Sequence, residues 1–249
     1  ETGSTGDGFR FLETLGHTVR QPEPSLVPIK TREGWAHALS GLALEDATLR
    51  VSQGGKKRFE RQGKMLFTYF GLSGPVVLNM SREVKELAKK GAVEIALDLL
   101  PKADQGTIDQ RLQEVFSEHR KKHIGNSLGD IVPPALVPAV LSVSGVDPDK
   151  PVHAVTREER LSIGRAFRHL PMTVTGFLGT EKAIVTSGGV SLREVDMKTM
   201  RSRKYPELYL VGDILDIDRP SGGYSLQLCW TTGYVAGEAA ADMVMKKSA

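Results

Sequence analysis

A carboxylate, a pair of glycines and the start of an apolar helix lie close together near the end of the chain, and together they could bind a small ligand. Asp213 follows Gly212, residues 221–224 read Ser-Gly-Gly-Tyr, and Leu226 and Gln227 begin an apolar helical stretch. An ionised Asp side chain only accepts hydrogen bonds, so it suits a ligand that is rich in hydroxyl donors. These residues therefore predict a site for a polyol joined to an electron-rich ring.

The glycine pair and the helix start would supply the flat side of that site. Because they lack side chains, Gly222 and Gly223 let the backbone approach a planar ligand closely. A helix that begins near Ser225 to Leu226 has first N–H groups without helical partners, and that end favours negative charge such as that on a reduced ring. A strand, a surface turn and a packed helix with an incidental Asp would have the same residue types, so both interpretations stay open here.

The elements that must position these residues follow from local patterns. A buried strand expected over residues 208–211 would deliver Asp213 to the carboxyl edge of a sheet, where α/β proteins tend to bind ligands. At the other end of the chain, Asp7 is expected to cap a short helix that stops at Gly16. The proline-punctuated segment 21–28 then marks the exit from one structural unit into another.

The middle of the chain changes periodicity twice. Strand signals dominate residues 25–100, and they return over residues 172–186 before a turn expected at residues 187–189. Residues 104–170 show helical spacing instead, and the string Thr156-Arg-Glu-Glu159 is a capping-box pattern that opens one of the helices. The sequence therefore predicts a β-rich part and a helical subdomain.

Composition narrows the class of protein. The single Cys229 excludes an internal disulfide framework, and a reducing, cytoplasmic setting is the simpler expectation. A net charge of +3 gives weak long-range steering and does not indicate a nucleic acid partner. The most apolar stretch, residues 226–245, is interrupted by Gly233, Gly237 and Glu238, so it does not read as a membrane span. We therefore expect neither a membrane nor a nucleic acid among the partners.

Other candidate chemistries have weaker support. Ser73 lies in a Gly-Leu-Ser-Gly-Pro string that approaches a hydrolase nucleophile elbow, but the final proline is instead expected to start a helix. His119 and His123 share a helical face, yet the cations between them disfavour a metal ion, and we expect no metal site. The basic runs 120–122 and 201–204 are expected to be solvated surface.

Strings of sequence along the chain, taken in order, carry a family resemblance. They are residues 3–8, residues 186–196, the C-terminal string 209–227, and the middle landmark Gly71 to Pro75 with residues 65–68 before it. The chain thereby resembles the HI0933-like (BaiN-like) family of bacterial flavoproteins, NAD(P)/FAD-dependent oxidoreductases. The resemblance runs over essentially all of the chain.

The resemblance implies a mixed fold, α+β with an α/β part. A β-barrel-like domain and a helical subdomain would be inserted into the C-terminal remnant of a doubly wound FAD-binding domain. The implied parts are residues 1–24 and 187–249 for the FAD-binding remnant, 25–100 and 171–186 for the barrel-like domain, and 101–170 for the helical subdomain.

The resemblance also implies FAD as the cofactor, NAD(P)H as a candidate electron donor and a small-molecule substrate. The implied cofactor-binding residues are Gly212, Asp213, Ser221, Gly222, Gly223, Tyr224, Leu226 and Gln227. Asp213 would meet the ribityl chain or a phosphate, residues 222–224 would line the isoalloxazine ring, and the backbone at 226–227 would face its N1/O2 edge. The family tends to have Asn where Ser225 stands, and Glu where Asp213 stands. No catalytic acid or base can be assigned, and Trp230, Tyr234 and Cys229 are expected to pack in the core.

One half of such a site is not found in the sequence. Proteins of this type begin with a strand, a G-x-G-x-x-G turn and a helix that bind the FAD pyrophosphate. Residues 3–8 have the wrong glycine spacing, so we expect the dinucleotide-binding half in an upstream segment that the chain lacks. The chain is then the C-terminal majority of an FAD-dependent oxidoreductase. The alternative is a non-enzymatic binding or scaffold domain derived from a flavoprotein and unable to hold FAD alone.

Overall fold

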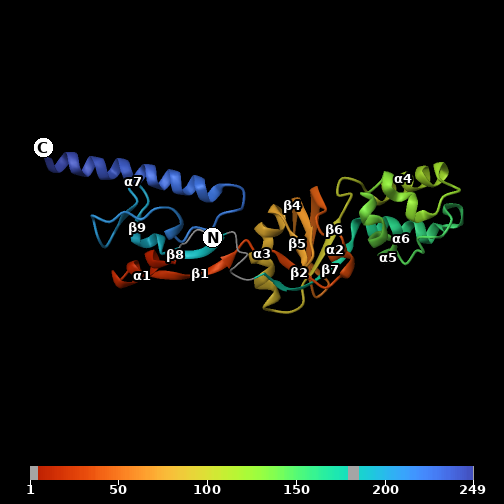
Figure 1. The fold of residues 1–249 in the computed structure, drawn as a ribbon, viewed down its shortest axis with the longest axis horizontal. Coiled ribbons are helices and arrows are strands. Elements are labelled where there is room, and N and C mark those ends of the chain that lie inside the picture. Colours follow the sequence, from red (N-terminus) through yellow and green to blue (C-terminus); the bar gives the residue numbers. More distant parts are fainter. Residues whose placement is uncertain (1–4, 179–184, 249) are drawn as a thin grey trace. The chain divides into compact units, whose positions relative to one another are not determined.

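The computed structural model describes residues 5–178 and 185–248, which form two compact units (Figure 1). Residues 27–178 make the larger unit, and residues 1–26 together with 179–249 make the smaller one. The smaller unit is thus assembled from both ends of the chain, and the larger unit is inserted between them.

The larger unit is built on a closed, antiparallel, six-strand barrel. Around the barrel the strands are β2 (Ile29–Thr31), β5 (Gly71–Ser73), β4 (Lys56–Thr68), β3 (Ala43–Gln53), β6 (Glu94–Asp98) and β7 (Leu170–Phe177). Buried side chains such as Leu49, Phe67 and Ile95 form its core. The pairing of β2 with β5 requires Gly71, because a Cβ there would lie 2.5 Å from the carbonyl oxygen of Ile29.

Two helices of the larger unit pack against the barrel. The short α2 (Gly34–Ala38) follows β2, and α3 (Pro75–Ala88) follows β5. Gly74, with φ of +91°, turns the chain just before Pro75, so α3 begins where the sequence predicts. The buried face of α3, which includes Val77 and Met80, joins the barrel core.

Three further α-helices make the helical part of the same unit. They are α4 (Gln105–Glu118), α5 (Val137–Ser144) and α6 (Arg157–Arg168), separated by 3-10 turns at Ile124–Asn126, Leu128–Asp130, Pro134–Leu136 and Val152–Ala154. The predicted capping box is confirmed at the start of α6. Thr156 Oγ1 accepts from the backbone N–H of Glu159 at 3.2 Å, and Glu159 Oε2 accepts from that of Thr156 at 2.7 Å.

The helices and the barrel share one hydrophobic core. A buried carboxylate also joins them: Asp98, at the end of β6, is 1% exposed and lies 3.2 Å from Arg168 of α6 and 3.6 Å from Arg50 of β3. Because a buried charge is tolerated only when it is paired, these contacts fix the end of α6 against the barrel. The larger unit is therefore a barrel and a helical bundle packed as one body.

The smaller unit contains a long C-terminal helix and short strands. Its elements are α1 (Asp7–Thr14), β1 (Val19–Ser25), β8 (Val185–Val190), β9 (Val195–Asp196), β10 (Arg201–Ser202) and α7 (Tyr224–Ser248), with 3-10 turns at Leu192–Glu194 and Gly212–Ile214. β1 pairs with β8, and β9 pairs with β10, both antiparallel. A small core including Leu12, Val190, Leu210 and Ala236 lies among these elements.

Three local predictions are wrong in this unit. Residues 208–211 are not a regular strand: Tyr209 makes only an isolated bridge to Arg201, although Leu210 is buried as expected. The expected turn at residues 187–189 lies inside β8. Asp7 is the first residue of α1, and Gly6 occupies the capping position without a side-chain cap.

Candidate functional site

The predicted acid lies on a 3-10 turn that is docked on α7. Gly212 is buried and has a φ of +66°, and its N–H donates to Thr232 Oγ1 at 2.9 Å. A Cβ at this position would lie 2.9 Å from Cys229 Sγ, so only glycine fits between the turn and the helix. The turn therefore holds Asp213 beside the N-terminal part of α7.

Arg219, which no sequence pattern predicted, connects the parts of the site. The side chain of Arg219 is 6% exposed, and its guanidinium contacts Oδ1 of Asp213. The same guanidinium donates from Nε to Ser225 Oγ at 2.8 Å and from Nη1 to the carbonyl of Ile217 at 2.6 Å. Arg219 thereby ties the 3-10 turn, the following loop and the first turn of α7 to one another. Its position depends on how that loop folds back, and no local sequence pattern reveals that.

The glycine pair is open on the side where a side chain would stand. Gly222 and Gly223 have φ values of +103° and +91°, and no atom lies within 4 Å of a Cβ built at either position. Gly223 accepts the first helical hydrogen bond, from the N–H of Gln227 at 3.1 Å. The N–H groups of residues 224–226 therefore precede the regular helical ladder, as expected of a helix start.

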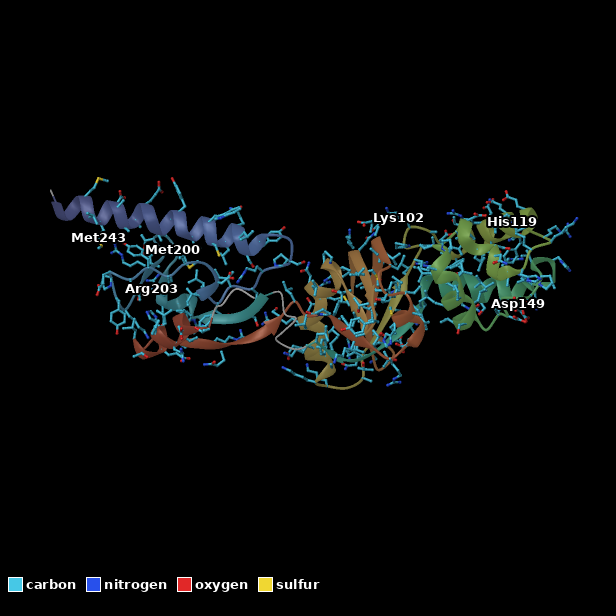
Figure 2. All side chains as sticks on the ribbon, in the orientation of Figure 1. Lys102, His119, Asp149, Met200, Arg203 and Met243 are labelled. Carbon is cyan, nitrogen blue, oxygen red and sulfur yellow. The ribbon has the colours of Figure 1, made fainter. Side chains whose placement is uncertain are left out.

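Aromatic and aliphatic side chains extend from the site along an exposed face of α7. Leu226, Trp230 and Tyr234 lie on that face and are more than half exposed, with Trp230 at 65% and Tyr234 at 67%, and Tyr224 at the helix start is also exposed. The expectation that Trp230 and Tyr234 pack in the core is therefore wrong. The opposite face carries Met243, which lies toward Met200 and the β9–β10 pair (Figure 2).

β8 contacts the loop of residues 214–216, which follows Asp213. Asp216 donates from its N–H to the carbonyl of Val190 at 3.1 Å, and Val190 forms a parallel bridge to Leu215. A Cβ on Gly189 would lie 2.6 Å from the carbonyl oxygen of Ile214. Gly189 therefore permits close approach of the loop backbone, and Gly188 permits the same for the backbone of β1, where a turn was expected.

A buried polar cluster joins the 3-10 turn Leu192–Glu194 and β10 to the two residues that precede β1. His17 is fully buried, with Nδ1 2.7 Å from Glu194 Oε2 and Nε2 3.0 Å from Ser202 Oγ. Glu194 also accepts from the N–H and the hydroxyl of Thr18 at 3.0 and 2.8 Å, and its carboxylate lies 3.1 Å from Lys204 Nζ.

The hydrogen bonds of this cluster determine the charge of Glu194. Burial raises the pKa of Glu194, but the hydrogen bonds from Thr18, Lys204 and His17 outweigh it and lower that pKa to about 2. Ser202, His17 and Glu194 have the order of a hydrolytic triad, yet Ser202 is 2% exposed, so a substrate does not reach it. The cluster is a structural support for the site.

The other candidates are placed as follows. The elbow-like Ser73 ends β5, and residues 3–4 of the N-terminal glycine string lie outside the described residues. His119 lies 2.8 Å from Asp130, and His123 lies 3.9 Å from Asp149. Within residues 5–178 and 185–248, no group of three or more potential ligands could hold a metal ion, and no helix is long and apolar enough to cross a membrane.

Comparison with known proteins assigns the chain to a family. Residues 23–185 match the model that describes the HI0933-like protein barrel and H2TH domain. The chain belongs to the HI0933-like family. The match covers the barrel and the helical bundle, so it confirms the family resemblance and accounts for the mixed α+β architecture of the larger unit.

Curated relatives extend the similarity to both units. The chain is 31% identical over 245 residues to a 3-dehydro-bile acid delta(4,6)-reductase of Clostridium scindens, covering 96% of this chain and 59% of the relative. It is 30% identical to the ribosomal RNA dihydrouridine synthase of Haemophilus influenzae and 27% identical to that of Escherichia coli. Those alignments cover 93% and 99% of this chain, and 55% and 58% of the relatives. The HI0933-like chain thus spans a little over half the length of the curated relatives it matches.

Proposed function

We propose that this HI0933-like chain supplies the wall of an FAD site that faces the flavin ring and the ribityl chain, in an oxidoreductase. One observation carries the proposal: an open glycine pair leads directly into the start of α7, beside the carboxylate of Asp213. A planar, hydroxyl-bearing and electron-accepting ligand matches the three features of that arrangement.

The chemistry of each group fits such a ligand. The backbone at Gly222 and Gly223 is unobstructed, so a flat ring can stack against it. The N–H groups at the start of α7 point toward negative charge on the ring. Asp213 is 61% exposed and accepts hydroxyl hydrogen bonds, although Arg219 already contacts its Oδ1.

The exposed apolar face of α7 is a surface on which another polypeptide segment could pack. Leu226, Trp230 and Tyr234 follow one another at four-residue spacing on that face, and isolated monomeric domains rarely expose such a stripe. We propose that a dinucleotide-binding segment packs there and completes a doubly wound FAD-binding domain, of which the smaller unit is the C-terminal remnant. FAD would then transfer electrons between a donor such as NAD(P)H and a substrate.

Replacing Asp213 with alanine tests this assignment. In the full-length protein, wild type is expected to bind FAD at near one equivalent, and Asp213→Ala is expected to bind it at least about tenfold more weakly, because a charge-assisted hydrogen bond is lost. Flavin absorbance during titration measures both.

The matched control is Asp130→Ala, because the side chain of Asp130 is 64% exposed and its carboxylate is also paired with one basic side chain, that of His119. That variant is expected to bind FAD like wild type. Absence of flavin binding in the wild-type protein, or equal binding in Asp213→Ala, would favour the alternative of a non-enzymatic scaffold.

A second candidate function concerns RNA, which the net charge did not indicate. Arg120, Lys121 and Lys122 come directly after His119, the C-cap of α4 that Figure 2 labels, and all three residues are exposed. Among the described ion pairs none involves these three cations. Consecutive unpaired cations attract phosphate groups, and two of the relatives carry ribosomal RNA in their names. The helical part of the larger unit is therefore a candidate RNA contact.

Neutralising this run tests the RNA candidate. The variant Arg120→Gln/Lys121→Gln/Lys122→Gln is expected to bind a fluorescent RNA hairpin more weakly than wild type. Its slope of log affinity against log salt concentration is expected to fall by about 2 to 3, since about one counterion is released per phosphate contact. The control Lys56→Gln/Arg58→Gln/Lys90→Gln removes three exposed charges elsewhere. Equal losses in both variants would contradict a specific contact.

A further inference from the structure

Arg219 places a buried positive charge at the start of α7. Its side chain is 6% exposed, and Nε donates to the hydroxyl of Ser225, the second residue of the helix. The helix dipole already makes this end positive, so a cation is not the residue that helix stability favours there. The arrangement therefore concentrates positive potential at one point of the proposed site.

The acid that contacts Arg219 is exposed, whereas the guanidinium itself is buried. Two of the three groups that Arg219 contacts are neutral oxygens, those of Ser225 and Ile217. The third, Asp213, is 61% exposed, so water screens its charge more than that of the buried guanidinium. Asp216 and Asp218 lie in the same loop but are more exposed than Arg219, so the guanidinium is the most buried of these four charged groups.

The charge is also fixed in place and in sign. A guanidinium stays protonated throughout the pH range of proteins, and its planar fork is held here by acceptors at Nε, Nη1 and Nη2. Such a group stabilises negative charge without rearranging when that charge appears.

We propose that Arg219 stabilises the negative charge that the flavin ring gains on reduction, and so raises the reduction potential of the bound cofactor. This inference rests on the proposed function. Transfer of a hydride from a donor such as NAD(P)H adds two electrons and one proton to the neutral oxidised ring and leaves the oxidised NAD(P)⁺. The ring thereby gains one negative charge. Arg219 is a positioning residue that acts through its field, and it takes no part in proton or electron transfer.

The test is the midpoint potential of FAD bound to the full-length protein. Arg219→Gln is expected to reduce the ratio of the affinities for reduced and oxidised flavin at least about tenfold, which lowers a two-electron potential by about 30 mV. Arg219→Lys retains the charge and is expected to stay within about threefold of the wild-type ratio. Ser225→Ala removes the hydroxyl contact without changing charge, and it too is expected to stay near wild type.

The following outcomes would overturn the inference. An unchanged potential in Arg219→Gln overturns the inference, and so does an equal fall in Ser225→Ala, which would assign the effect to loop geometry. Loss of oxidised FAD binding in Arg219→Gln alone would make Arg219 a binding residue instead. If the proposed function itself is wrong, the wild-type protein will bind no FAD at all, and this result differs from every outcome above.

Discussion

Replacing Gly223 with valine is expected to raise the dissociation constant for FAD at least about 100-fold, equivalent to about 2.7 kcal/mol of binding free energy. A branched side chain would fill the space that is open above the backbone at this position. It would hold a planar ring away from the first N–H groups of α7. Flavin absorbance and fluorescence quenching during titration of the full-length protein measure the change.

Backbone strain must be separated from this steric effect. Gly223 has a φ of +91°, so valine there is strained by about 1 to 3 kcal/mol whatever ligand binds. Gly41 is the matched control, because its φ is +95°, its built Cβ also meets no atom within 4 Å, and it lies in the other unit. Gly41→Val should lose comparable stability and keep wild-type FAD affinity. Equal loss of affinity in both variants would show that Gly223 does not face the ligand.

Replacing Glu194 with glutamine is expected to destabilise the smaller unit by about 3 kcal/mol at neutral pH. The pKa of Glu194 is about 2 in the folded chain against 4.5 for an ordinary glutamate, and each unit of difference corresponds to about 1.4 kcal/mol. Its side chain is only 17% exposed, so solvent screening removes little of this contribution. Urea unfolding followed by circular dichroism measures it.

The pH dependence has a definite direction. Because the folded-state pKa is lowered, the contribution of Glu194 is complete above pH 4.5 and is lost as the pH falls from there toward 2. Wild type and Glu194→Gln should therefore converge in stability near pH 2. The control Glu86→Gln changes a carboxylate that is more than half exposed and pairs with the equally exposed Lys89, and it should leave the unfolding midpoint unchanged. A difference between wild type and Glu194→Gln that persists unchanged to pH 2 would contradict the assigned pKa.

Much of the larger unit was predictable from local signals. Thr156 and Glu159 form their capping box because both partners lie within one helical turn, and Pro75 starts α3 because proline suits a first helical position. Closure of the strands into a barrel came from the family resemblance, since pairings such as β2 with β7 join residues that are far apart in the chain.

The smaller unit shows why other predictions failed. Gly188 and Gly189 read as a turn, yet they are glycines because the backbones of Gln21 and Ile214 pass too close for a Cβ. Leu208 and Leu210 contribute to the core without forming a ladder. A glycine pair looks the same in a turn and at a close backbone approach, and alternating apolar residues look the same in a paired strand and in an unpaired buried segment. Only the tertiary contacts distinguish these cases.

Some features of the candidate site were likewise predictable from the sequence, and others were not. The start of α7 directly after the glycine pair was predicted to within one or two residues, because turn and helix-start signals are local. Arg219 and the Glu194 cluster were not predicted. Arg219 reaches back to Asp213 across a loop, and Glu194 joins His17 across most of the chain, so neither contact leaves a signal in sequence spacing.

Hydrogen exchange on the full-length protein, with and without saturating FAD, tests the central claim most directly. The N–H groups of residues 224–226 precede the helical ladder, so they should exchange rapidly without ligand. FAD is expected to slow exchange over residues 222–227 more than elsewhere in this chain. Binding of FAD with no protection at these residues, and protection elsewhere, would contradict the assignment of this segment as the wall that faces the flavin ring.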